Sequence, residues 1–222
     1  MGRGRSKTGS QGGSRRRRRR VTPLKVIDVW SYRHRKNNEP FVDDINTAAR
    51  TLEESFPGMM EDVETVNAVK LNKRNNGILG YYTLDGTVNM NLAYTDPEEM
   101  NVTMDACAKS GYHPSRGNKS GTEAVALHEL GHALTTTVAK RMGIDGVFAL
   151  DEAADRIVAN ARKSAGKIAG RGGVQQFRSQ ISGYASESNA EAVAEAVTDY
   201  YCNGRNASTA SKAIMAELFK YR

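Results

Sequence analysis

A helical stretch with two histidines one turn apart constrains this chain more than any other feature. Residues 122–142 read TEAVALHELGHALTTTVAKRM, and His128, Glu129 and His132 at their centre form the pattern H-E-x-x-H. Residues four apart share one helix face, so both imidazoles can bind a single metal ion. Neutral imidazoles at this spacing suit Zn2+, and Glu129, about 100° around the helix, is placed to take a proton from a metal-bound water. The pattern predicts a catalytic zinc site.

The neighbouring residues favour a packed helix over a chance match. Ser120 and Glu123 are the two ends of a capping box, S-G-T-E, which places the helix start eight residues before His128. A second apolar stripe on the same helix suits the protein core. It consists of Leu127, Leu130, Leu134 and Val138.

A catalytic zinc site needs a third protein ligand, which the motif itself does not supply. No histidine follows His132, so the downstream candidates are carboxylates. They are Glu152, Glu187, Glu191, Glu195 and Glu217. Glu191 and Glu195 stand out because they lie one turn apart in SNAEAVAEAVTDYYC, a predicted helix with almost no polar face. Buried carboxylates need partners, and a divalent cation and a histidine N–H are two suitable ones.

Taken together, H-E-L-G-H and the later Y-x6-E-x3-E resemble the gluzincin metallopeptidases of the lethal-factor and Pro-Pro endopeptidase type. Tyr184, Glu191 and Glu195 stand at those spacings. The resemblance implies that Glu191 is the third zinc ligand and that Glu195 supports the ligands from behind. It also implies that Tyr184 donates a hydrogen bond to the oxyanion. Where bulky aromatic residues would follow the glutamate, this chain has Ala192 and Val193, so the packing there must differ.

The resemblance covers about residues 120–200 and implies a zincin-like metallopeptidase fold of the α+β class. We expect one such domain over residues 21–222, with a small mixed sheet, the motif helix beneath it and a helical C-terminal lobe. A weaker resemblance, carried by GYAS and EA-x-AEA, is to phage head-associated proteins with a zincin-like fold. It implies only a setting in a virion.

Local patterns predict the remaining elements. Strands are expected at residues 26–30 and 63–71 and in a hairpin over residues 80–95. The hairpin turns at Asp85-Gly86, and its edge strand could pair with an extended peptide beside the metal. Helices are expected from Asp43 or Asp44 to Phe56 and over residues 151–165, 174–180 and 208–220. Residues 96–119 suggest an irregular connection.

The first twenty residues differ in composition from the rest of the chain. They hold nine of the 32 basic residues and none of the 25 acidic ones, so the other 202 residues have a net charge of −2. Without apolar residues after Met1, residues 1–20 are expected to be disordered. Six consecutive arginines predict contact with nucleic acid or another polyanion. They are Arg15, Arg16, Arg17, Arg18, Arg19 and Arg20. The alternative is a solvated tail with no specific partner.

Cysteine content and hydropathy indicate in which compartment we expect the protein. Two cysteines, Cys107 and Cys202, predict no disulfide framework, and Cys202 is expected to be a buried thiol. The segment after the basic start is too short and too charged for a signal peptide. No apolar run approaches the roughly 18 residues that a membrane span requires. We therefore expect a cytoplasmic or virion-associated protein without a membrane segment.

The sequence thus predicts a zinc-dependent endopeptidase that acts on a protein or peptide substrate. The alternative is a nucleic-acid-associated structural or packaging protein, held by its arginine tail, in which a zincin-like fold is retained for shape. A third possibility combines the two, as a virion-associated protease tethered to nucleic acid. Glu129 favours an enzyme, because a structural metal site would not need a carboxylate at that position.

Overall fold

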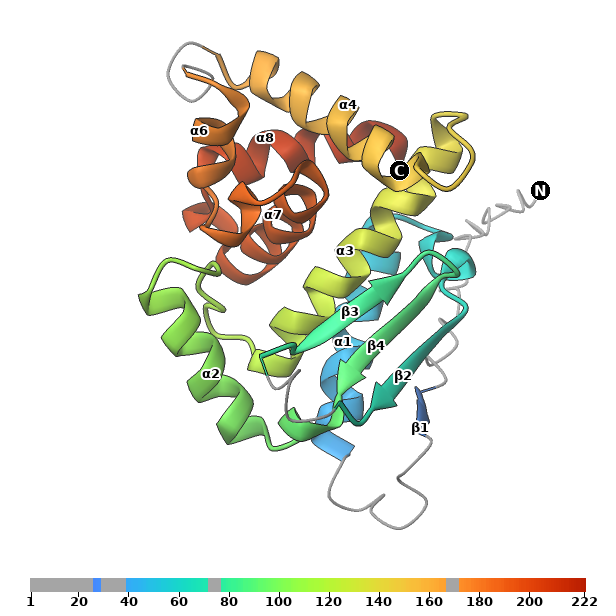
Figure 1. Cartoon of the computed structure of the whole chain (residues 1–222), viewed down its shortest axis with the longest axis vertical. Helices are drawn as coiled ribbons and strands as arrows, with labels where there is room; N and C mark the ends of the chain where they lie inside the picture. The colour runs from blue at the N-terminus through green and yellow to red at the C-terminus, as the bar shows by residue number, and fades with distance from the viewer. Residues whose placement is uncertain (1–25, 29–38, 72–76, 167–171) are drawn as a thin grey trace, which may run out of the picture.

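The computed structural model describes residues 26–28, 39–71, 77–166 and 172–222 and has a mixed α+β fold (Figure 1). The long helix α3 (Gly121–Arg141) runs between a small sheet and a group of C-terminal helices. The predicted α+β class is therefore confirmed.

The sheet is mixed, with strand order β1-β2-β4-β3. Strands β1 (Val26–Asp28) and β4 (Thr87–Asn91) both pair in parallel with β2 (Thr65–Val69), whereas β3 (Gly80–Thr83) pairs antiparallel with β4. The predicted β3–β4 hairpin is confirmed, and Gly86 in its turn has a φ of 90°, a conformation that favours glycine. The sheet order makes β3 an edge strand, and this strand packs beside α3.

The core joins α1 (Glu39–Ser55), α3 and the inner face of the sheet. The apolar faces of both helices are buried, which confirms the core role predicted for the stripe on α3. On α1 and just after it the residues of these faces are Ile45, Ala48, Ala49, Leu52 and Phe56; on α3 they are Leu127, Leu130, Leu134 and Val138.

Residues 96–119 are not the irregular connection that the sequence suggested, because half of them form helix α2 (Pro97–Lys109). Asp96 caps this helix by accepting hydrogen bonds from the backbone N–H groups of Glu98 and Glu99, and Pro97 follows at the first helical position. The apolar stripe is narrow, with Met100 and Met104 as its buried residues. A two-residue stripe gives little helical periodicity, which explains the error.

In the described part of the C-terminal lobe, four helices lie close to their predicted positions. They are α4 (Ala149–Ser164), α6 (Val174–Ser179), α7 (Asn189–Asn203) and α8 (Thr209–Leu218). Within the described residues, five short 3-10 turns lie between or after the main elements. They are η3 (Met59–Asp62), η5 (Leu92–Tyr94), η6 (Tyr184–Ser186), η7 (Gly204–Asn206) and η8 (Phe219–Tyr221).

Helices α3 and α7 pack closely because small residues face each other. A Cβ added to Gly131 would lie 3.0 Å from Cα of Ala194 and 3.4 Å from Cβ of Val197. The alanine-rich α7 is mostly buried, as its sequence predicted. This close packing brings the carboxylates of α7 next to the histidines of α3.

Some sequence predictions lie outside the described residues. These are the disorder of residues 1–20 and the end of the first strand at residues 29–30. Cys107 and Cys202 are free thiols, and Cys202 is buried as predicted. In the part of the chain that the structure describes, no helix is both long enough and apolar enough to cross a membrane.

Candidate metal centre

The start of α3 is fixed by capping and by a contact with α1. The hydroxyl of Ser120 accepts the backbone N–H of Glu123 at 2.9 Å and donates to Oδ2 of Asp44 at 2.6 Å. The Glu123 side chain pairs with Lys119. These contacts set where along the helix each histidine stands.

Three side chains converge beside α3. Nε2 of His128 lies 3.1 Å from Oε2 of Glu191, and Nε2 of His132 lies 3.4 Å from the same oxygen. One ligand atom from each residue lies within 4.8 Å of the other two, so this group could hold a metal ion. The structure thus brings together both motif histidines and one of the five candidate carboxylates.

The state of the Glu191 carboxylate fits a cation. Although two ring nitrogens lie nearby, its Oε2 is buried and forms no hydrogen bond in the part of the chain that the structure describes. A buried carboxylate oxygen without a hydrogen bond is costly, and a bound cation would compensate it. Two imidazole nitrogens and one carboxylate oxygen are a donor set typical of catalytic zinc.

The electrostatics of the group point the same way. Burial alone would raise the pKa of Glu191, but His128 and His132 together lower it below its ordinary value. Burial alone would lower the pKa of His128, but Glu191 and Glu195 raise it well above 6.5. The carboxylates therefore favour positive charge at this position, which either a proton or a metal cation can supply.

Glu195 lies behind the histidines, one turn further along α7, and its side chain is 1% exposed. Its Oε1 lies 2.8 Å from Nδ1 of His128 and 3.0 Å from Nδ1 of His113, and its Oε2 accepts the hydroxyl of Ser182 at 2.7 Å. A carboxylate at this position requires Nδ1–H on His128, which leaves Nε2 free to face Glu191. Burial opposes the charge of Glu195, but His113 and His128 lower its pKa to about 2.

Glu129 lies on the other side of α3, towards strand β3. It is buried, and a Cβ added to Gly80 would lie 3.0 Å from both its Cγ and its Oε1. Glycine at position 80 therefore makes room for this side chain. Burial raises the pKa of Glu129, although His128 and His132 oppose the increase.

Tyr184, in η6, lies against the same group of residues. Its ring stacks on His128 at a centroid distance of 5.6 Å, and its backbone N–H donates to the carbonyl of Tyr112 at 2.9 Å. Burial and the nearby charges of Glu191 and Glu129 raise the pKa of its hydroxyl. The hydroxyl therefore stays protonated and can act as a donor.

Two cavities flank the group along β3. One has a volume of about 210 Å³ and the other about 250 Å³. Gly80, His128, Glu129 and Tyr184 line both cavities, so these residues lie where the two meet. A chain running along β3 would thus pass the candidate metal ligands with room for side chains on either side.

The remaining candidate carboxylates have other partners. Glu152 pairs with Arg156 on α4, Glu187 accepts the hydroxyl of Tyr112 at 3.3 Å, and Glu217 accepts the amide of Asn160 at 3.1 Å. The structure therefore separates them from the convergent group.

Sequence reasoning missed His113 and Ser182, both of which bind Glu195. The lack of a histidine after His132 says nothing about the chain before the motif, where His113 stands. Its signal was present: it is one of only four histidines, and it stands between Tyr112 and a proline.

The predicted nucleic-acid-binding arginines, residues 15–20, lie outside the described residues.

Comparisons with protein-family models, with curated proteins and with solved structures find no match for this chain. The candidate site therefore rests on the positions and chemistry of its own residues.

Proposed function

We propose that this chain is a zinc-dependent endopeptidase with a zincin-like fold, of the gluzincin type that its motifs resemble. One observation carries the proposal: His128, His132 and Glu191 converge through Nε2, Nε2 and Oε2, with Glu129 beside them. This is the combination of ligands and base that metal-assisted hydrolysis requires.

The bound metal and Glu129 would have separate roles in the reaction. A bound Zn2+ would supply a Lewis acid that activates the attacking water and polarises the scissile carbonyl. Glu129 takes a proton from that water as its oxygen bonds to the carbonyl carbon, and passes the proton to the amine nitrogen when the C–N bond breaks. Burial raises the pKa of Glu129 towards the range in which a base works near neutral pH.

Two further features would hold and polarise the substrate. Strand β3 is the edge of the sheet next to Glu129, so an extended peptide can pair with its outer edge. Tyr184 remains protonated and lies against His128, where its hydroxyl can donate to the carbonyl oxygen of the peptide as negative charge develops.

The test replaces only the base. Zinc-loaded Glu129→Gln should bind about one zinc per chain, as the parent does, and cleave a peptide library at least 100-fold more slowly, because general-base catalysis contributes roughly 10²–10⁴-fold. Glu152→Gln, a change at an exposed glutamate of α4, is the matched control and should leave hydrolysis unchanged. Cleavage by Glu129→Gln at the parent rate would show that the proposed mechanism is wrong.

A second candidate rests on Arg15–Arg20, which favour a nucleic-acid-associated structural or packaging protein. Both functions apply to one protein if the enzyme is a virion-associated protease tethered to nucleic acid. Hydrolysis by the parent and its loss in Glu129→Gln would exclude a purely structural role. An inactive parent that binds nucleic acid tightly would favour it.

A further inference from the structure

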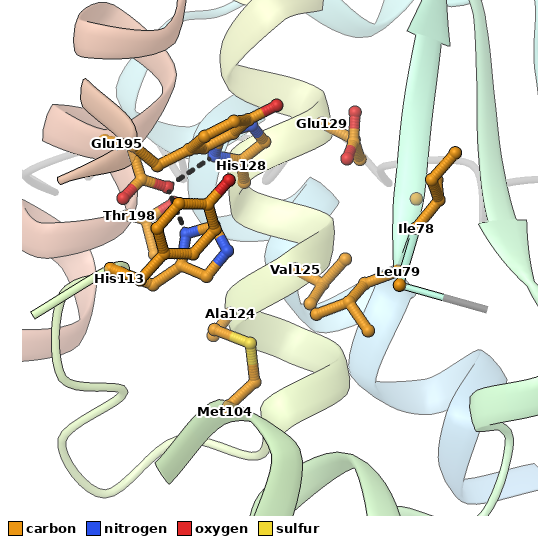
Figure 2. Close-up of a pocket in the computed structure, with 14 residues that line it drawn as sticks. Ile78, Leu79, Met104, His113, Ala124, Val125, His128, Glu129, Glu195 and Thr198 are labelled. Atoms are coloured by element: carbon orange, nitrogen blue, oxygen red, sulfur yellow. Dashed lines mark hydrogen bonds and ion pairs between the residues drawn. The ribbon is translucent and has the colours of Figure 1, made fainter. Parts of the chain in front are cut away.

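The cavity of about 210 Å³ has one apolar wall and one polar wall. Its apolar wall consists of Ile78, Leu79, Met104, Ala124 and Val125. Figure 2 shows the imidazole of His113 on the opposite side, across from Leu79 and Val125. A substrate side chain that entered this cavity would therefore contact carbon atoms on one side and the His113 ring on the other.

The orientation of the His113 ring is fixed. Its Nδ1 lies 3.0 Å from Oε1 of Glu195, and its ring packs edge-on against Tyr112 and Tyr184 at 4.9 and 5.2 Å. The backbone N–H of Tyr112, the preceding residue, donates to the carbonyl of Cys107 at 3.0 Å, which anchors the loop to the end of α2. The ring cannot turn without breaking these contacts.

This orientation leaves Nε2 facing the cavity (Figure 2). Within the described residues, no hydrogen bond to this nitrogen is found, and the His113 side chain is 14% exposed. An imidazole whose Nδ1–H donates to a carboxylate can accept a hydrogen bond at Nε2. The cavity therefore presents a hydrogen-bond acceptor opposite an apolar wall.

We propose that this cavity is the pocket that selects the substrate residue beside the scissile bond, and that His113 makes it prefer tyrosine. The inference rests on the proposed function and adds the substrate class. The apolar wall takes the ring of the substrate residue, and its hydroxyl donates to Nε2. Phenylalanine fills the same space but leaves Nε2 without a partner. Glu129 and Glu195 line the cavity too and disfavour an acidic side chain.

The test compares matched peptides on matched enzymes. Cleavage of a peptide library first identifies the substrate position whose side chain binds in the cavity. Two peptides are then compared that differ only at this position, with tyrosine in one and phenylalanine in the other. The parent should cleave the tyrosine peptide with a kcat/KM about 3- to 10-fold higher, the range of one neutral hydrogen bond. In His113→Asn this ratio should fall to about one, because an asparagine amide can replace Nδ1 at Glu195 but has no group at the position of Nε2.

His113→Gln serves as the matched control, because its longer amide can present an oxygen near the position of Nε2 and should keep a preference for tyrosine. The ratio of two peptides on one enzyme does not depend on the fraction of enzyme that is folded, so partial loss of stability cannot produce the result. A parent ratio of one or below, or an equal ratio in parent and His113→Asn, would overturn the proposal. A preference for lysine over tyrosine in the parent would overturn it too.

Peptide binding tests the preference for tyrosine without requiring the proposed activity. The same two peptides can be titrated against zinc-loaded Glu129→Gln and followed by fluorescence anisotropy, which needs no turnover. About 3- to 10-fold tighter binding of the tyrosine peptide, lost when His113→Asn is added, supports the pocket even if the parent cleaves nothing. Equal binding of both peptides overturns it.

Discussion

The carboxylates on the two sides of helix α3 differ in their hydrogen bonding. On the α7 side, Glu195 has a partner for each oxygen: His113 and His128 at Oε1 and Ser182 at Oε2. On the β3 side, Oε2 of Glu191, which α7 also supplies but which lines the cavity along β3, is buried without a hydrogen bond. No hydrogen bond to Glu129 is found among the described residues. The Glu191 side chain is 22% exposed and that of Glu195 is 1% exposed, so the two glutamates differ in exposure as well as in hydrogen bonding.

We infer from this difference that Glu195 supports the histidines, whereas Glu191 and Glu129 take part in the proposed reaction. A fully paired carboxylate fixes the orientation and tautomer of the histidine that it binds. Buried carboxylates without hydrogen-bond partners lower stability unless a ligand compensates them, and they mark the place where a cation and a substrate would bind. We therefore expect substitutions on the β3 side to abolish function, and those on the α7 side to weaken it.

The largest effect should come from Glu191. Glu191→Ala removes one of the three proposed ligands, so zinc affinity should fall by more than the roughly 10–100-fold typical of a supporting residue, and hydrolysis should be lost with it. Glu195→Ala is the matched change one turn away and should stay within that 10–100-fold range. Competition with a chelator of known affinity measures both. A greater loss in Glu195→Ala would reverse the two roles.

Tyr184→Phe should act on turnover and leave the metal in place. Removing one donor to a developing oxyanion costs roughly 10²–10³-fold in kcat, whereas the zinc affinity should stay at the parent value because the hydroxyl is not a ligand. Steady-state kinetics and metal analysis on the same preparation measure the two effects. An unchanged kcat would remove Tyr184 from the chemistry.

The α7 side should also determine the stability of the metal-free protein in acid. The pKa of Glu195 is about 2 in the fold and 4.5 in its ordinary state, so its charge stabilises the fold above pH 4.5 and this contribution is lost as pH falls towards 2. Denaturant unfolding over that range should show a shallower pH dependence for Glu195→Gln than for the parent. Parallel curves would mean that the Glu195 contacts do not stabilise the charged form.

The smallest effect on the site should come from the arginine tail. Removing residues 1–20 should weaken binding to DNA or RNA and flatten its salt dependence, since arginine–phosphate contacts release counterions. Zinc affinity and turnover of a short neutral peptide should not change. Equal salt slopes for full-length and truncated protein would exclude the tail as a nucleic-acid-binding segment.

Local signals explain how much of the fold was predictable. The Ser120 cap of α3, the Asp-Gly turn and the alanine-rich pattern of α7 each act within a few residues, so the sequence alone located them. The approach of α7 to α3 also had a local cause, because Gly131 and Ala194 are small. Helix α2 was missed because its cap was overlooked and its apolar stripe is short.

The contacts between distant parts of the chain were less accessible from sequence. The space for Glu129 depends on Gly80, and the contact of His113 with Glu195 joins residues 82 positions apart. No spacing rule relates such pairs, since only the packing of α2, α3 and α7 brings them together. The sequence singled out the two glutamates of α7 and distinguished their proposed roles only by resemblance.

A crystal structure of the zinc-loaded protein, with the metal located by anomalous scattering, would test the division of roles between the two glutamates. We predict zinc bound to Nε2 of His128 and of His132 at about 2.0–2.1 Å and to a Glu191 oxygen at about 2.0–2.2 Å. Glu195 should remain on Nδ1 of His128, away from the metal. Zinc bound to Glu195, with Glu191 turned to solvent, would contradict the assignment.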